Sequence, residues 1–583
     1  MIPSIPPSRP LVPSLAPAAL FALFALAILG GCGGEGEAAS SPAPGGSWSD
    51  LVTLFDEWRV FEEPPRLEGA PDYREATNAR RLGELASYQA RLQGLDPSGW
   101  PVAEQVDWHL VRAEMNGMAF HLRTLRPWAR DPAYYASVRT YESDTPAEEG
   151  PTIHDALRLW EYSVWPRTGL DVPEPLTTGE RGELLRKLRA IPPLLEQARG
   201  NLAGSDARDL WVGGIRAFQN QSGALGQLLE RLGEVGESPG ELTEAIVAAR
   251  EVTDAFAAWL EDEAPSRTGP SGLGREAYTW FLRNVLLVPM SWEEEVAVTR
   301  RELARSHASL RLEENRNRDL PELPTAETPE ELDRLQHEAI TSYLEFLDRN
   351  RILQVEPGMD TALRERLFSF SPPETRNFFS QAIHRDPTTL WTHLYHWWDT
   401  ARMREEPHPS PIRREALRYN VWMSRSEGLA TVMEEWMMHA GLYDENPRVR
   451  EVVWIMLATR AARGLGSLYA HDNQLTMEEA GDLHVEWTPR GWMRRDLELL
   501  GFEQHLYLRQ PGYGPSYVTG GRLLEETMAE RARQLGEGFS LRQFFEELNA
   551  SGMIPVSLIH WEVTGDDRMI RELLEGLEPQ PFR

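Results

Sequence analysis

Apolar residues recur three and four positions apart along most of the chain after Trp48. The pattern is clearest in residues 51–61, 180–202 and 241–264, where apolar side chains occupy positions i, i+3, i+4 and i+7. This spacing is the stripe of an amphipathic helix. Runs that alternate between apolar and polar residues are scarce, and no repeat of fixed length is present. The sequence therefore predicts a mainly α-helical protein with little β structure, and it does not favour a solenoid.

A Pro- and Gly-rich break, APSRTGPSGLG at 264–274, interrupts the helical pattern. Such breaks mark the ends of helical segments. We expect it to divide an N-terminal helical half, residues 48–270, from a C-terminal half, residues 271–583. The second half holds most of the histidines, a tryptophan-rich stretch and the glycine-rich segment 512–521. Any chemistry is therefore expected in the C-terminal half.

The N-terminus has the layout of a secretory signal over residues 1–31. Arg9 precedes an apolar run at 18–29 that is too short to cross a bilayer comfortably. The only cysteine, Cys32, directly follows a Leu-Gly-Gly sequence, which resembles the bacterial motif that is lipidated at its cysteine. Residues 32–47 are rich in Gly, Ala, Ser and Pro and predict a flexible tether. We expect an exported protein anchored to the bacterial membrane through lipid on Cys32, facing the periplasm or the cell exterior; the alternative is a buried cysteine that falls there by chance.

Composition narrows the classes of partner. The formal net charge of the 583 residues is −30, which excludes nucleic acid and anionic lipid surfaces as favoured partners, because both need a basic face. Hydrophobic residues make up 41% of the chain, enough for a sizeable core. A single cysteine also means that the chain has no internal disulfide, which suits an exported protein that does not depend on one.

The stretch HLYHWWDTARM is the first candidate for chemistry, within a helix expected over 386–407. On a straight helix His393 and His396 lie about 60° apart and can share a ligand, as can His396 and Asp399. His393 and Asp399 lie roughly 120° apart, so a straight helix does not let both reach one ion. Two interpretations remain open: a metal site, or structural histidines that are hydrogen-bonded in an aromatic core.

A second helix is expected over 414–445, after the short Pro-rich turn at 408–411. Glu427 and Glu434 are seven residues apart and share one of its faces. Because the turn is short, the two helices are expected to pack antiparallel, so that the glutamates could meet the histidines. Imidazole and carboxylate together are a plausible set of metal ligands. A buried Glu–His network without metal is an equal alternative.

Four segments of the C-terminal half occur in a familiar order. They are SEGLATVMEEWMMHAGLYDE (426–445), RAARGLGSLYAHDNQLTMEEA (460–480), RQPGYGPSYVTGGRLLEE (509–526) and FSLRQFFEELNASGMIPVSLI (539–559). Together they resemble the bacterial family known as domain of unknown function 885, densely from about residue 385 to 565 and faintly before that. Its members are large, mostly helical, zincin-like proteins, often exported and regarded as metal-dependent peptidases. The resemblance implies one zincin-like helical body whose two halves surround a cleft.

The resemblance also assigns the metal-ligating positions. The first metal histidine of the family falls on His393 and the second on Asp399, while the carboxylate ligand falls on Glu427 and its companion on Glu434. The catalytic glutamate falls on Leu394, which cannot accept a proton. The Pro-Gly pair that bends the family's helix is replaced here by two tryptophans at 397–398.

Further along the chain the same resemblance covers four more positions. Arg463, His471 and Tyr517 match the family pattern, whereas an aspartate of the family is replaced by Ser467. The tyrosine is the residue expected to steady an oxyanion.

Two functions follow, and the sequence leaves both open. In the first, the protein is a metallohydrolase of peptides or amides that binds one divalent metal ion, zinc foremost. The ion would be held by His393, Glu427 and either His396 or Asp399. Its base would be a displaced residue, either Glu434 or His471, and Arg463 and Tyr517 would complete the catalytic set.

In the second, the protein is a non-catalytic lipoprotein that uses the same region to bind peptide, envelope material or a partner. The missing base at Leu394 and the exchange at Ser467 favour this function. The retained polar residues favour the first.

Overall fold

The computed structural model describes residues 45–137 and 176–575, apart from 235, 237–239 and 416, and of residues 397 and 400 it describes only the backbone. The predicted signal sequence, Cys32 and nearly all of the predicted tether lie outside the described residues.

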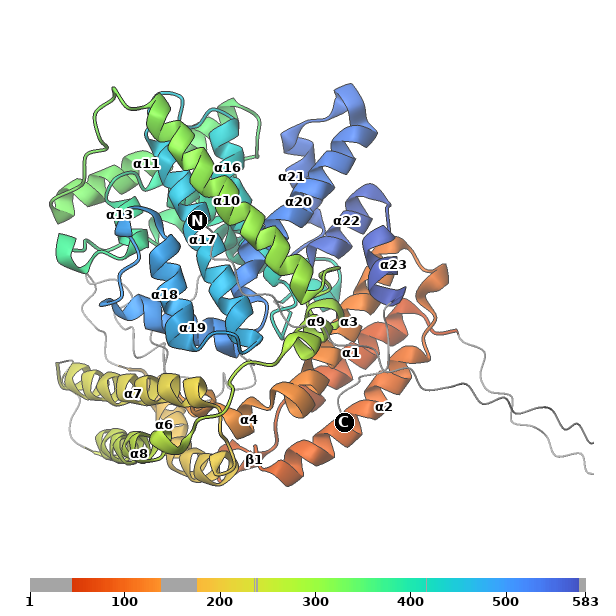
Figure 1. The fold of residues 1–583 in the computed structure, drawn as a ribbon. Helices are drawn as coiled ribbons and strands as arrows, with labels where there is room; N and C mark the ends of the chain where they lie inside the picture. The colour runs from red at the N-terminus through yellow and green to blue at the C-terminus, as the bar shows by residue number, and fades with distance from the viewer. Residues whose placement is uncertain (1–44, 138–175, 235, 237–239, 416, 576–583) are drawn as a thin grey trace, which may run out of the picture. The chain divides into compact units, whose positions relative to one another are not determined.

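The described chain is mainly helical (Figure 1), which confirms the prediction of a mainly α-helical protein with little β structure. Its only strands in the described ranges are β1 (Arg66–Leu67) and β2 (Ala70–Pro71), a two-residue antiparallel pair. The helices before residue 275 are α1 (Trp48–Glu62), α2 (Glu75–Gln93), α3 (Val102–Phe120), α4 (Pro127–Arg130), α6 (Thr178–Leu202), α7 (Arg208–Glu234) and α8 (Glu241–Glu263). The next helices are α9 (Arg275–Asn284), α10 (Trp292–Arg316), α11 (Pro329–Arg349), α12 (Pro357–Arg364), α13 (Phe378–Ile383), α14 (Thr388–His393) and α15 (Tyr395–Glu405).

The remaining α-helices are α16 (Met423–His439), α17 (Val449–His471), α18 (Met477–Trp487), α19 (Glu498–Arg509), α20 (Tyr513–Leu535), α21 (Leu541–Ala550), α22 (Val556–Thr564) and α23 (Arg568–Glu575). A π-helical turn, η2 (His121–Leu125), follows α3. Short 3-10 helices are η1 (Pro97–Gly99), η3 (Pro132–Tyr135), η5 (Ala264–Ser266), η6 (Pro373–Thr375), η7 (Pro411–Arg413), η8 (Pro489–Gly491) and η9 (Gly536–Gly538).

The three helices with the clearest apolar stripe, α1, α6 and α8, form within a few residues of their predicted bounds. Two of them start at a capping box. Ser47 accepts a hydrogen bond from the backbone of Asp50, whose carboxylate reaches back to Ser47, and Thr177 and Glu180 do the same at α6. This arrangement satisfies amide donors that the first turn of a helix leaves without partners.

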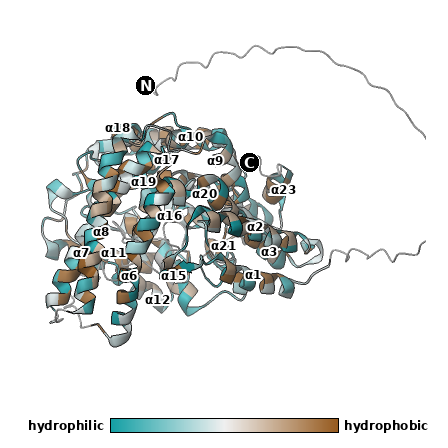
Figure 2. Cartoon of the chain, turned by 90° about the horizontal axis from the view of Figure 1, so that it is seen from below, coloured by the Kyte–Doolittle hydropathy of each residue, from teal (hydrophilic) through white to brown (hydrophobic). Residues whose placement is uncertain are grey.

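Two apolar clusters organise most of the core. One is confined to residues 70–260 and joins α6, α7 and α8, which lie side by side in Figure 1, to Tyr73 and Trp128. The largest runs from Leu51 in α1 to Leu573 in α23. Helices on both sides of the break at 264–274 therefore share one core. Figure 2 shows hydrophobic and hydrophilic residues mixed along the helices, and within the described ranges no helix is long and apolar enough to cross a membrane.

Glycines bring α20 into contact with α16 and α17. A Cβ on Gly428 of α16 would lie 2.5 Å from the backbone of Gly520, and a Cβ on Gly520 would lie 2.1 Å from the carbonyl oxygen of Ser424. Gly514 of α20 packs in the same way on Ser467 of α17. Only glycine allows backbones to approach so closely. The glycine-rich segment 512–521 is thus a helix-packing surface.

Candidate metal centre

The helix predicted over 386–407 is broken, so the prediction of a continuous helix is wrong. It ends at His393 as α14 and restarts at Tyr395 as α15, because Leu394 departs from helical geometry with φ −74° and ψ 29°. The break places the rings of His393 and His396 with their centroids 5.0 Å apart, at 80° to each other. The chain has no Pro-Gly pair to bend this helix, yet the bend is present, one residue after His393.

The second predicted helix begins later than expected, at Met423 instead of residue 414. Its carboxylate Glu427 nevertheless meets the histidines, as expected: His396 Nε2 lies 3.5 Å from Glu427 Oε2. One ligand atom each of His393, His396 and Glu427 lies within 4.8 Å of the other two. All three side chains are buried, with at most 3% of any residue exposed. The structure thus brings together three of the four metal-ligating residues proposed from the sequence.

Glu427 is held in place from its other side. The Tyr513 hydroxyl, at the first residue of α20, donates a hydrogen bond of 2.7 Å to Glu427 Oε1. Burial alone would raise the pKa of Glu427, but the hydrogen bonds from His396 and Tyr513 and the charge of Arg463 leave that pKa below its ordinary value. The carboxylate is therefore ionised and aimed at the imidazoles through Oε2.

His393 is oriented by a buried ion pair. Arg460 of α17 donates to both oxygens of Glu434, at 2.7 and 2.6 Å, and Glu434 Oε1 lies 3.1 Å from His393 Nδ1. Burial raises the pKa of Glu434 against the pull of Arg460. The Arg460 guanidinium also lies 3.1 Å from His393 Nδ1, so both members of the ion pair contact this ring nitrogen and fix the orientation of the imidazole.

Asp399 is not part of this group. Its carboxylate accepts hydrogen bonds of 2.9 and 3.2 Å from Arg425 of α16, and Arg402 binds it from the same helix. On a straight helix, Asp399 was expected to lie too far around the helix from His393 to share an ion. In the broken helix, Asp399 contacts Arg425, whereas His396 contacts Glu427. The negative charge of Asp399 is therefore paired with two arginines and not with the histidines.

The other residues proposed from the sequence lie around the group at different depths. Tyr517 stacks 6.4 Å from His393 between ring centroids, and the guanidinium of Arg463 lies 4.2 Å from the centre of the Tyr517 ring. Arg463 also donates a hydrogen bond of 2.6 Å to Glu503. His471 instead donates through Nε2 to the backbone oxygen of Tyr507 at 2.9 Å. Burial lowers the pKa of His471 to about 4.

Sequence reasoning missed two residues that position the group, Arg460 and Tyr513. Both carried a signal. Arg460 lies three residues before Arg463, and Tyr513 lies four residues before Tyr517, so each shares a helix face with a residue that the sequence did single out.

The donor set fits a divalent metal ion. Two imidazoles and one carboxylate match the protein ligands of many zinc sites, and a buried carboxylate that stays ionised needs either a positive partner or a metal. Glu434 is paired with Arg460 and Glu503 with Arg463, whereas the contacts of Glu427 are the Tyr513 hydroxyl and the imidazole of His396. Leu394, at the break, offers no carboxylate to the group.

Comparisons with known proteins give a family and a fold. The sequence profile of a bacterial family of proteins of unknown function, DUF885, matches residues 66–351, just under half of the chain. This match ends before α14 and lies where the resemblance read from the sequence was faint, so it does not include the histidines or Glu427. No curated protein matches the chain significantly.

Two solved structures are similar over nearly their whole length. One, from Shewanella oneidensis and described as a candidate lipoprotein of unknown function, has a TM-score of 0.62 and 16% identity, and the similarity covers 88% of this chain and 97% of that one. The other, a candidate lipoprotein from Colwellia psychrerythraea, has a TM-score of 0.58 and 13% identity, with 90% and 99% covered. At these identities the similarity shows a shared fold.

Proposed function

Because the chain belongs to the bacterial family of unknown function DUF885, we propose a function from its own residues: an exported, lipid-anchored protein that holds one divalent metal ion and does not catalyse hydrolysis. His393, His396 and Glu427 hold the ion, and zinc is the metal that suits them best. The convergence of these three buried side chains is the observation that carries the proposal. When bound, such an ion would supply Lewis acidity and two units of positive charge.

The chain's own residues hold the ligands in place. Arg460 and Glu434 fix the ring of His393, and Tyr513 fixes the carboxylate of Glu427. These contacts from outside the ligand set raise metal affinity by removing the freedom of the ligands.

The groups needed for hydrolysis are engaged elsewhere. Glu434, one candidate base, is bound at both oxygens by Arg460, and His471, the other, donates to a backbone oxygen. The position that the family resemblance gives to the catalytic base is Leu394. A protein that cannot accept a proton at the reacting centre lacks general-base catalysis. This favours a non-catalytic lipoprotein, whose further ligands would be peptide, envelope material or a partner protein.

A peptide or amide hydrolase is the second candidate. One observation favours it, since two imidazoles and a glutamate are also the protein ligands of catalytic zinc sites. In that case Tyr517, which lies beside His393 and under the guanidinium of Arg463, is the residue placed to steady an oxyanion.

The lipid anchor and the location belong to the same proposal. They rest on the signal-like N-terminus, on Cys32 after Leu-Gly-Gly, and on the description of both similar structures as candidate lipoproteins. The anchored protein would face the periplasm or the cell exterior. Labelling of cells with a radioactive fatty acid tests this directly: the label should enter the wild-type protein and be absent after C32A.

The metal is tested by measuring zinc after equilibrium dialysis against a zinc buffer. We expect about one zinc per chain in the wild type, and a loss of at least tenfold in affinity for Glu427→Gln. Glu435→Gln is the matched control, because Glu435 lies on the same helix α16 and pairs with Arg305 and His439 instead of His393 or His396. Wild-type protein that takes up no zinc, manganese or iron would overturn the proposal.

Activity is tested on the zinc-loaded wild type with a mixture of peptides followed by mass spectrometry. We expect no cleavage above that of Glu427→Gln. Cleavage that needs zinc, is lost in Glu427→Gln and is retained in Glu435→Gln would establish the hydrolase instead.

A further inference from the structure

A separate cavity of about 600 Å³ lies at the N-terminal end of α17, a volume typical of small-molecule sites. The residues that set its character are Arg318, Arg385, Arg448, Arg490, Leu323 and Trp492. Four arginines in one cavity stand out in a chain with a net charge of −30. The cavity shares none of its lining residues with the metal centre.

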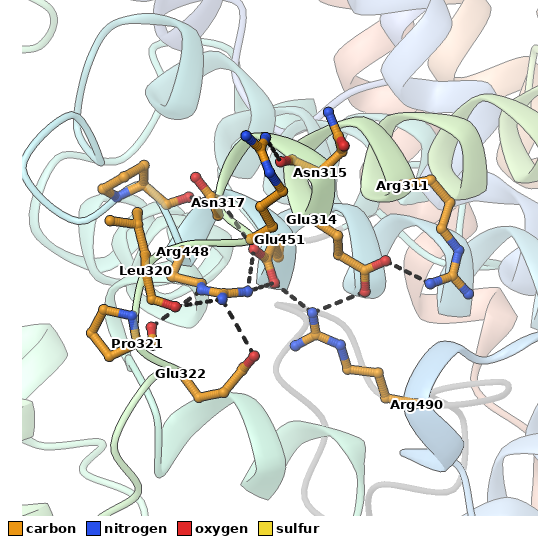
Figure 3. Close-up of polar contacts among 12 residues, drawn as sticks. Arg311, Glu314, Asn315, Asn317, Leu320, Pro321, Glu322, Arg448, Glu451 and Arg490 are labelled. Carbon is orange, nitrogen blue, oxygen red and sulfur yellow. Dashed lines mark hydrogen bonds and ion pairs between the residues drawn. The ribbon is translucent and has the colours of Figure 1, made fainter.

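Two of the arginines are fixed by a network that Figure 3 shows. Arg448 donates to Glu451 at 3.0 Å and to the backbone oxygens of Leu320 and Pro321 at 2.7 and 3.2 Å. Arg490 bridges Glu451 and Glu314. Guanidinium groups held in this way lose little further freedom when a ligand binds.

The backbone at one of these arginines is strained. Arg490 has φ 59° and ψ 13°, the left-handed region that a residue with a side chain seldom adopts. Such a conformation persists only where the surroundings hold it, and it is most frequent at functional sites. Here the contacts to Glu314 and Glu451 hold the side chain and keep it at the cavity wall.

Arg385 is the arginine whose charge is least compensated. Its guanidinium donates to the side chain and backbone oxygens of Gln381 at 2.6 and 2.8 Å, and it lies 5.1 Å from the ring centre of Trp492. In the described part of the chain no carboxylate lies within ion-pair distance of it. Burial lowers the pKa of Arg385, and the positive charges of Arg376 and Arg490 lower it further, against the opposing charge of Glu322. An anion at this place would relieve the repulsion.

The balance of charge sets the class of anion. Glu314 and Glu322 also line the cavity, and three of its arginines pair with carboxylates: Arg318 with Asp319, Arg448 with Glu322 and Glu451, and Arg490 with Glu314 and Glu451. Among the arginines of the cavity this leaves Arg385, whose charge a single negative charge neutralises. Arginine binds carboxylates through two parallel hydrogen bonds. The ring of Trp492 and the side chain of Leu323 add an apolar surface next to Arg385.

We propose that this cavity binds a small organic carboxylate that carries an apolar or aromatic group. The carboxylate pairs with Arg385, and the apolar group lies against Trp492 and Leu323. This site is separate from the metal centre and does not depend on the proposed function.

Isothermal titration of the purified protein with N-acetylphenylalanine tests the proposal. The matched amide, N-acetylphenylalaninamide, has the same ring without the charge and should bind at least tenfold more weakly. Arg385→Gln should lower the affinity for the acid at least tenfold, and Arg385→Lys should restore part of it, because the charge returns without the planar fork. Arg334→Gln is the control, since Arg334 is exposed and its ion-pair partner within the described residues is Glu338 of its own helix. Glu427→Gln should also bind the acid as the wild type does.

Several results would overturn the proposal. They are no measurable binding of the acid, equal binding of acid and amide, or binding that Arg385→Gln leaves unchanged. Inorganic phosphate that binds more tightly than the acid, and loses its binding in Arg385→Gln, would replace the carboxylate by a phosphate ligand. If Arg385→Gln loses its helical circular dichroism, Arg318→Gln takes its place. Arg318 is exposed at the cavity rim, and its loss should lower the affinity severalfold.

Discussion

Two buried carboxylates, one on α15 and one on α16, have different kinds of partner. Asp399 of α15 is bound by Arg425 of α16 and by Arg402, so its charge is cancelled within the protein. Glu427 of α16, two residues beyond Arg425, faces the imidazole of His396 from α15. The same pair of helices thus builds one closed ion pair and one set of atoms suited to an added cation. The difference shows that burial of a carboxylate does not by itself indicate a metal site, whereas the nature of its partner does.

The largest effect is expected at the closed pair. Arg425→Met should destabilise the protein by about 3–5 kcal/mol, because it leaves the buried Asp399 with only the partly exposed Arg402. Urea unfolding followed by circular dichroism measures this. The double variant with Asp399→Leu should recover much of the loss, since it removes both charges. A cost below about 1 kcal/mol for the single variant would show that the pair is not the closed unit described here.

A third buried carboxylate sharpens the comparison, because it has neither arginine nor imidazole. Glu295 of α10 accepts hydrogen bonds from the Tyr278 and Thr519 hydroxyls, at 2.7 and 3.0 Å. Burial raises the pKa of Glu295 from 4.5 to about 7, against these hydrogen bonds. The folded state therefore holds a proton here that the unfolded chain releases above pH 4.5, and stability is lost as pH rises through this window.

Glu295→Gln should remove that loss. Relative to the wild type, we expect the variant to gain stability between pH 5 and pH 8, by on the order of 3 kcal/mol at most. Urea midpoints measured at several pH values test this. Parallel pH curves for the two proteins would mean that Glu295 is ionised at neutral pH.

Zinc should stabilise the protein through Glu427 and the two histidines, and not through the ion pair between Asp399 and Arg425. Zinc at ten times its Kd should stabilise the wild type by about 1.4 kcal/mol, because only the folded state presents the three ligands together. Thermal unfolding with and without zinc measures the shift. Glu427→Gln and His396→Gln should abolish it, and Asp399→Asn should keep it even though its own stability is lower. A zinc response lost in Asp399→Asn as well would erase the distinction between the two carboxylates.

The smallest effect is expected at His471. Its imidazole donates to the backbone oxygen of Tyr507 and is not in the metal-binding group. His471→Gln should therefore leave zinc binding unchanged, and equilibrium dialysis should give the wild-type stoichiometry. A lower stoichiometry would return His471 to the centre, in the role that the sequence proposed for it.

The sequence was informative where local patterns decide the structure. Apolar spacing predicted α1, α6 and α8, and the family resemblance brought Glu427 and His393 to one place. It was uninformative where distant contacts decide. No turn residue marks the break at Leu394, and helix propensity alone would continue the helix through a leucine. Because of the break, His396 and not Asp399 lies next to Glu427. The spacing along a straight helix did not decide between these two residues.

Long-range pairing explains the rest. Arg425 is 26 residues from Asp399, and Tyr513 is 86 residues from Glu427, so neither contact follows from local sequence. The predicted signal sequence and Cys32 lie outside the described residues and stay predictions.

The glycine contact between α16 and α20 has a consequence for how the molecule opens. With Gly428 and Gly520 backbone to backbone, an axial slide of either helix would drive main-chain atoms into each other. Helices α16 and α20 are therefore expected to unfold as one unit. Their amide protons should exchange with deuterium only through the rarest opening events of the molecule. Tyr513, which donates a hydrogen bond to Glu427, is part of α20. Local unfolding elsewhere, for instance among α6, α7 and α8, would then leave this hydrogen bond intact.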